Sequence, residues 1–165
     1  MRKMLLSWIV ALSIVLFGGV SAFAGDVVKT LPGDITLAQA QKIIAAALKK
    51  AEEIKVPMNI AVVDAGGNLK AFVRQEDAFI GSIDISIKKA VTARYFNMTT
   101  RDLGAVSQVG QPLYGIEASN HGLILFAGGV PLVDAHNVII GAIGVSGGSV
   151  DEDESVAKAG AAVLK

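Results

Sequence analysis

A glycine-punctuated apolar stretch from Pro112 to Gly148 constrains the fold of this chain more than any other part. Its apolar runs are short, rich in β-branched residues and bounded by glycine, which is typical of β-strands rather than helices. We expect strands at Leu123 to Ala127, Val130 to Val133 and Val138 to Val145. Asp134 to Asn137 is expected to be a hairpin turn, because Asp and Asn hydrogen-bond their own backbone and tolerate left-handed geometry.

The preceding half of the chain predicts a helix followed by a hairpin. Thr36 to Gln39 has the pattern of a capping box, and the helix that it opens should end before Pro57. Met58 to Val63 is a nearly continuous apolar run, as expected of a central strand. Asp64 to Asn68 then supplies a turn, and Leu69 to Arg74 returns as the hairpin partner.

Helical periodicity resumes in two later parts of the chain. One apolar face starts at Ile80, and a fresh cap at Thr99 opens a short helix that reaches Val106. A second capping box, Ser149 to Glu152, opens a last helix that runs toward Leu164. The residues expected on the buried face of the central helix are Ile80, Ile83, Ile87, Ala90, Val91 and Arg94.

The order of these elements indicates an α+β domain. Helices fall between groups of strands and not between every pair, which favours an antiparallel sheet over a parallel one. The chain of 165 residues is long enough for a single core.

The N-terminus has the features of a secretory signal peptide. Arg2 and Lys3 precede the uncharged apolar run Leu5 to Phe17, and Ala22-Phe23-Ala24 offers small residues where a signal peptidase cleaves. We therefore expect a signal peptide at 1–24, an N-terminal linker at 25–35 and a single domain at 36–165. The alternative is an uncleaved membrane anchor. Cleavage would leave a periplasmic or extracellular protein that no membrane segment retains.

Charge and cysteine content exclude several function classes. Signal cleavage would remove two basic residues from 15 and no acidic ones, leaving 13 against 15, so bulk charge does not favour nucleic-acid binding. The absence of cysteine excludes disulfides, thiol catalysis, thiolate zinc sites and covalent attachment of haem through C-x-x-C-H. Ser119 to Gly122 places a serine near a histidine but does not have the G-x-S-x-G pattern, and the sequence lacks H-E-x-x-H, so hydrolase and zinc protease chemistry are not expected.

Three strings, PLYGIEASN, GGVPLVDAHN and GAIGVSGG, resemble the signature of the GlcG/HbpS family of small haem-binding-like domains. The likeness extends upstream through NIAVVDAGG, GSIDI and KAVTA, and so covers nearly the whole chain after residue 35. Asn137 stands where the family pattern has a turn glycine. His121 occupies a position that the pattern leaves open.

This resemblance implies a five-stranded antiparallel sheet of the profilin-like kind, flanked by helices, and a homo-oligomer. It also implies an exported, non-enzymatic protein that holds haem without a covalent bond, on an apolar surface or in a cleft between subunits. Two alternatives remain open. One is an accessory protein for a small molecule related to glycolate or a corrinoid, and the other is an oligomeric partner of a membrane sensor.

His121 is the candidate iron ligand, because imidazole binds haem iron and this residue directly precedes a predicted buried strand. His136, the second of the two histidines, is expected to be exposed in a hairpin. Tyr114 is near His121 in sequence, and the phenol of Tyr95 and the thioether of Met98 are alternative ligands.

The remaining candidates are polar groups of the central helix and beyond. Lys88, Lys89, Arg94 and Arg101 are either partners for haem propionates or an ordinary solvated face. The Thr92 hydroxyl is a further candidate near the cofactor. Two other patterns are assigned structural roles: the glycines of Gly141 to Gly147 allow close backbone approach, and the acidic residues 151–154 are expected to be a solvated first turn that favours the helix dipole.

The N-terminal pattern predicts that the mature chain begins at Gly25. Intact-mass measurement of protein recovered from its native compartment should therefore give the mass of residues 25–165. A recovered chain that retains Met1 would contradict the prediction of a cleaved signal.

Overall fold

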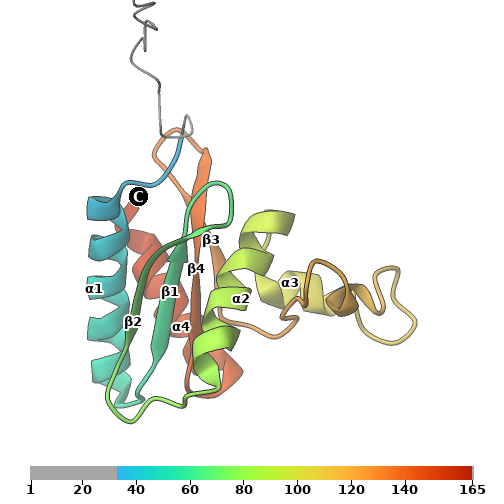
Figure 1. Ribbon diagram of the computed structural model, residues 1–165, viewed down its shortest axis with the longest axis horizontal. Helices are drawn as coiled ribbons and strands as arrows, with labels where there is room; N and C mark the ends of the chain where they lie inside the picture. The colour runs from blue at the N-terminus through green and yellow to red at the C-terminus, as the bar shows by residue number, and fades with distance from the viewer. Residues whose placement is uncertain (1–32, 165) are drawn as a thin grey trace, which may run out of the picture.

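The computed structural model describes residues 33–164, so the predicted signal peptide at 1–24 and most of the predicted linker lie outside the described residues. Within that range the chain is an α+β domain with a four-stranded antiparallel sheet in the order β2-β1-β4-β3 (Figure 1). No helix of residues 33–164 has the length and apolar character needed to cross a membrane. The elements are α1 (Leu37–Ile54), β1 (Asn59–Val63), β2 (Leu69–Arg74), α2 (Ser82–Phe96), α3 (Thr100–Ala105), η1 (Ile116–Ala118), β3 (Gly129–Val133), β4 (Ile139–Ser146), α4 (Val150–Ala161) and η2 (Ala162–Leu164).

Helices cover both faces of the sheet. Figure 1 shows α1 and α4 on one face and α2 on the other, with α3 beyond it. Because side chains alternate along a strand, β1 and β4 send one set of apolar residues toward α1 and α4 and the other set toward α2. The first set includes Ile60, Val62, Ile143 and Val145; the second includes Ala61, Val63 and Ala142.

The glycines of β4 let neighbouring backbones approach closely, as predicted. A methyl group on Gly144 would lie 2.0 Å from the carbonyl oxygen of Ser86 and 2.4 Å from the amide nitrogen of Ala90, both on α2. A methyl group on Gly141 would lie 2.3 Å from the carbonyl oxygen of Val63 on β1. These distances leave no room for any side chain, so α2 packs against the sheet through backbone atoms.

Local sequence signals for caps and turns are confirmed. Thr36 and Ser149 both form the predicted capping boxes at the starts of α1 and α4. Thr99 caps α3 by accepting a hydrogen bond from the backbone N–H of Asp102. At the β3–β4 turn, Asp134 Oδ1 accepts hydrogen bonds from the backbone N–H groups of His136 and Val138, both at 2.9 Å.

The predicted strand at Leu123 to Ala127 is wrong, and with it the five-stranded sheet. Residues 123–127 form no strand. Their backbone groups contact helices α2 and α3 instead of a neighbouring strand. The N–H of Ile124 donates to Thr92 Oγ1 at 3.1 Å. The carbonyl oxygen of Leu125 lies against Gly104 of α3, where an added methyl group would approach to 1.9 Å. The likeness to profilin remains a prediction.

The outer edge of β3 is closed to further strands. The N–H of Gly129 donates to Thr100 Oγ1 of α3 at 2.9 Å, and Pro131 has no N–H to offer. Proline in an edge strand and a capped backbone group both discourage pairing with another strand. The sheet therefore ends at β3 within residues 33–164.

The predicted apolar face of α2 is wrong in part. Ala90 is buried as predicted, but the other residues that face the sheet are small or polar, and Ile87 and Val91 lie at its margin while Ile80 is exposed. The glycine and alanine surface of the sheet explains this, because it accepts a close helix backbone and offers no space for isoleucine side chains. The buried residues of α2 are Ser82, Ser86, Lys89, Ala90, Thr92 and Ala93.

Residues 106–126, here called the arm, extend away from the sheet beyond α3 (Figure 1). The arm contains the short helix η1 and several exposed apolar side chains. It is closed on itself by hydrogen bonds such as Leu113 N to Val106 O, 3.1 Å, and Leu123 N to Glu117 O, 3.0 Å. The arm is therefore an ordered projection with an apolar surface.

Adding one methyl group at the α2–β4 contact should destabilise the fold. We expect Gly144→Ala to lower the free energy of unfolding by about 1–3 kcal/mol, the usual cost of overpacking, measured by chemical denaturation. Gly81→Ala is the matched control, because a methyl group there meets no atom within 4 Å. Equal stability of Gly144→Ala and Gly81→Ala would contradict the close packing of α2.

Candidate functional site

His121 lies on the arm in a strained turn. Asn120, His121 and Gly122 have φ angles of 50°, 61° and 96°, and left-handed geometry is unfavourable for histidine. The Gly122 N–H donates to the carbonyl of Ser119 at 2.9 Å, which closes the turn. His121 is exposed, so the turn presents its imidazole to solvent.

α2 anchors this turn. Thr92, which is 1% exposed, accepts a hydrogen bond from the N–H of Ile124 at 3.1 Å. The Nζ atom of Lys88 lies beside Gly122, 3.7 Å from the position of an added methyl group. Thr92 therefore holds the segment that follows His121, and its hydroxyl does not face the surface where a ligand could reach it.

Apolar side chains accompany His121 on the arm. Tyr114 is 65% exposed, and Phe126, which ends the arm, is 44% exposed. These side chains are available for contact with another molecule. Other exposed apolar side chains of the arm are Val106, Val109 and Leu113.

Lys89 is buried inside the fold. Its side chain is 0% exposed, and its ammonium donates to Asp153 Oδ2 at 2.7 Å and to the carbonyl of Val145 at 2.9 Å. Burial lowers the pKa of Lys89 and raises the pKa of Asp153, while the hydrogen bond and the attraction between their charges act in the opposite direction. Lys89 is therefore neither part of a solvated face nor free to meet a propionate.

The pair connects the arm to the core. The ammonium of Lys89 lies 4.8 Å from the centre of the Phe126 ring, within range of a cation–π interaction. On the other side, Asp153 Oδ1 accepts hydrogen bonds from the N–H groups of Gly147 and Gly148, both at 3.0 Å. The interaction thus joins α2, β4, α4 and the end of the arm.

The prediction of a solvated acidic turn is wrong for Asp153 and Glu154, which are buried. Glu154 forms ion pairs with Arg101 at 3.0 Å and with Lys158 at 3.1 Å. Arg101 is therefore engaged between α3 and α4. Among residues 33–164 there is no group of three or more histidine, aspartate or glutamate side chains placed to hold a metal ion.

Arg94 and Tyr95 contact residues near the C-terminal end of α2 and in the β1–β2 turn. Arg94 donates to Asn97 Oδ1 at 2.7 Å, and its buried Nε atom has no hydrogen-bond partner among the described residues. The Tyr95 ring packs over Gly67 in the β1–β2 turn, where a methyl group would approach it to 2.5 Å. Of the four candidate cations, Lys88 is the one whose described contacts include the His121 turn.

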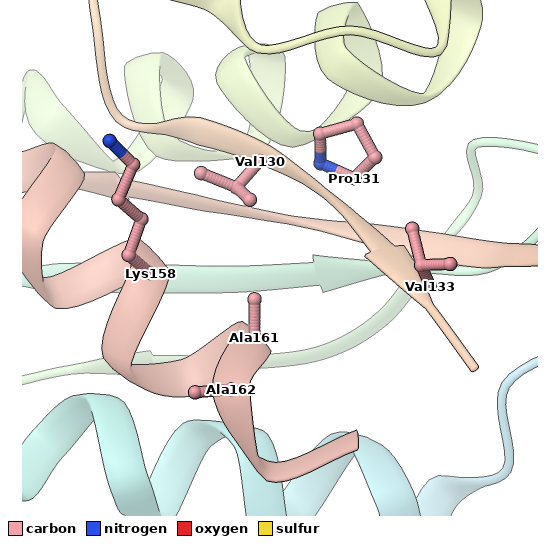
Figure 2. Close-up of a pocket in the computed structure, with 6 residues that line it drawn as sticks. All are labelled: Val130, Pro131, Val133, Lys158, Ala161 and Ala162. Atoms are coloured by element: carbon pink, nitrogen blue, oxygen red, sulfur yellow. The ribbon is translucent and has the colours of Figure 1, made fainter. Parts of the chain in front are cut away.

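A separate apolar groove of about 410 Å³ lies between β3 and the C-terminal end of α4. Figure 2 shows Val130 and Ala161 facing each other across it, with Lys158 toward one end. No candidate site residue lines this groove. Its lining residues are Val130, Pro131, Val133, Lys158, Ala161 and Ala162.

Comparison with known proteins identifies the family. Residues 35–162 match the family described as haem degrading protein HbpS-like. The chain belongs to the HbpS-like family. The resemblance read from the sequence strings is thereby confirmed, and the match spans nearly all of the described domain.

Two relatives and one solved structure show the range of the HbpS-like family. An uncharacterised 15.0 kDa protein encoded between dhaT and dhaS in Citrobacter freundii is 42% identical over 125 residues, 75% of this chain and 87% of the relative. The corrinoid adenosyltransferase PduO of Salmonella typhimurium is 32% identical over 136 residues, 82% of this chain but only 40% of PduO. The structure of a PduOC–haem complex superposes with a TM-score of 0.76 at 32% identity, covering 80% of this chain and 96% of that one.

Removing the carboxylate from the buried pair should be costly. Asp153→Asn leaves the Lys89 ammonium buried without an anion, which should lower the free energy of unfolding by about 3–5 kcal/mol. Asp151→Asn is the control, because Asp151 pairs with Arg101 at the surface and should cost less than about 1 kcal/mol.

The loss in Asp153→Asn should also depend on pH. Without Asp153, burial lowers the Lys89 pKa unopposed, so the unfolded chain binds more protons than the folded chain below the ordinary lysine value of 10.5. Stability of this variant, relative to the parent, should therefore rise as pH increases toward that value. Chemical denaturation at several pH values measures both effects, and a loss below about 1 kcal/mol at neutral pH would contradict the buried ion pair.

Proposed function

We propose that this HbpS-like protein binds haem without a covalent bond on the surface formed by the arm and the adjoining side of α2, with His121 as the iron ligand. The observation that carries the proposal is the strained turn, which presents an imidazole to solvent on the same arm as exposed aromatic and aliphatic side chains. Imidazole is a common axial ligand, and an apolar surface suits a porphyrin ring. The haem complex of the structurally similar PduOC supports the choice of cofactor.

The β3–α4 groove is a weaker location for haem. Its lining consists of apolar side chains and Lys158, and none of these residue types except a deprotonated lysine can bind iron. The His121 surface offers an imidazole, with the phenol of Tyr114 on the same arm. The chemistry of the available donors therefore favours the arm.

The residues around the proposed site have separate roles. His121 binds the iron, Tyr114 and Phe126 contact the porphyrin, and Thr92 holds the turn through its hydrogen bond to Ile124. Bound haem supplies the iron and its redox chemistry. Lys89 acts from within the fold, because its ammonium supports the ring of Phe126.

We also propose that the protein works outside the cytoplasm as a homo-oligomer. The N-terminal sequence pattern supports export. The exposed apolar residues of the arm support self-association, because burying them between subunits would be favourable. A cleft between subunits would give haem a second apolar wall.

A corrinoid-related role is the second candidate function. The similarity to PduO, a corrinoid adenosyltransferase, supports it, although the chain spans only 40% of the length of PduO. Competition distinguishes the two roles. A corrinoid that displaces haemin at micromolar concentration would favour the second candidate.

Replacing the candidate ligand tests the leading proposal. Asparagine tolerates the left-handed backbone of position 121, so His121→Asn removes the imidazole and keeps the turn. We expect loss of the shifted Soret band and at least about tenfold weaker haemin binding, equivalent to about 1.4 kcal/mol. Absorbance titration with haemin measures both quantities.

His136→Asn is the matched control, because His136 is exposed in the β3–β4 turn and should not bind the iron. Its spectrum and affinity should equal those of the parent protein. An unaltered Soret band in His121→Asn would refute His121 as the ligand and redirect the assignment to Tyr114, Tyr95 or Met98.

A further inference from the structure

The Lys88 side chain is the one cation that the described contacts place at the His121 turn. Its Nζ atom lies next to Gly122, the residue that follows His121, 3.7 Å from the position of an added methyl group. Gly122 also has a φ of 96°, so a side chain there would be strained. The Lys88 side chain is partly exposed beside this turn.

Lys88 is held more loosely than Lys89 and Arg101, which pair with carboxylates of α4. Its described partner is Asp84, one helical turn away, at 2.9 Å. The side chains of Lys88 and Asp84 are 37% and 67% exposed, and an exposed pair of this kind contributes little stability. A ligand carboxylate can therefore replace or join Asp84 at small cost.

The neighbouring cations are committed elsewhere. Lys89 is fully buried against Asp153, Arg101 bridges to Glu154 on α4, and Arg94 bonds to Asn97 at the end of α2. Lys89 and Arg101 are thus engaged by carboxylates of α4, and Arg94 is directed toward the C-terminal end of α2. Lys88 remains as the group that an anionic ligand at the His121 turn would meet.

We propose that Lys88 is a specificity residue that recognises a carboxylate of the bound porphyrin, and that Asp84 competes for the same ammonium. This inference rests on the proposed function, because it names the residue that binds the charged groups of haem on the same surface. The chemical class selected is an iron porphyrin with free carboxylates. A porphyrin with the same ring and esterified carboxylates lacks the group that Lys88 would bind.

Comparing haemin with its dimethyl ester isolates this contact. Each porphyrin is titrated into the full-length protein and its variants, with the Soret band as the readout. We expect Lys88→Met to weaken haemin binding about fivefold, or about 1 kcal/mol, and to leave the ester unchanged. Lys88→Arg keeps the positive charge and should retain most of the preference for haemin.

Asp84→Asn provides the opposing variant. Removing the competing carboxylate frees the Lys88 ammonium, so haemin should bind more tightly while the affinity for the ester stays the same. This variant leaves Lys88 in place and has no buried contact to disturb, because Asp84 is exposed. A gain of affinity is not expected from loss of structure, so it supports the specific role of Lys88.

The results separate failure of this inference from failure of the proposed function. If haemin binds but Lys88→Met weakens both porphyrins equally, or neither, carboxylate recognition by Lys88 is refuted and haem binding stands. If the parent protein gives no shifted Soret band with either porphyrin, both proposals fall.

Discussion

The ion pair of Lys89 with Asp153 joins the parts of this domain on which the proposed site depends. Its ammonium also bonds to the carbonyl of Val145 and lies over the Phe126 ring, so one buried charge contacts a helix, a strand, a second helix and the end of the arm. Burying two charges is costly unless each is paired and hydrogen-bonded. Here the remaining acceptor of Asp153 is filled by two backbone N–H groups.

The pair requires α2 to lie close to the sheet, and the small residues of β4 permit this. Gly144 allows the backbone of α2 to touch the strand, and the α2 face that results is polar enough to include a lysine. The same helix holds the segment that follows His121 through Thr92. Core packing and presentation of the proposed iron ligand are thus properties of one helix.

Local chemistry made the caps and hairpins predictable from sequence. Thr36, Ser149 and Asp134 act on backbone groups within four residues, so their patterns predict their structures.

The errors arose where residues distant in sequence come into contact. Residues 123–127 have a strand pattern, but Thr92 and α3 receive their backbone groups. Lys89 could not be assigned to the core without knowing that Asp153 lies opposite. The sequence feature that could have indicated its burial is a helical stripe of small and polar residues, Ser82, Ser86 and Lys89. His121 was identified as a candidate, but its strained turn and its neighbour Lys88 required the fold.

A structure of the protein with haemin bound tests the central claim most directly. We expect iron bonded to the His121 imidazole, with the porphyrin against the arm and α2. Density for the porphyrin in the β3–α4 groove, or iron bonded to another side chain while His121 stays in solvent, would contradict it.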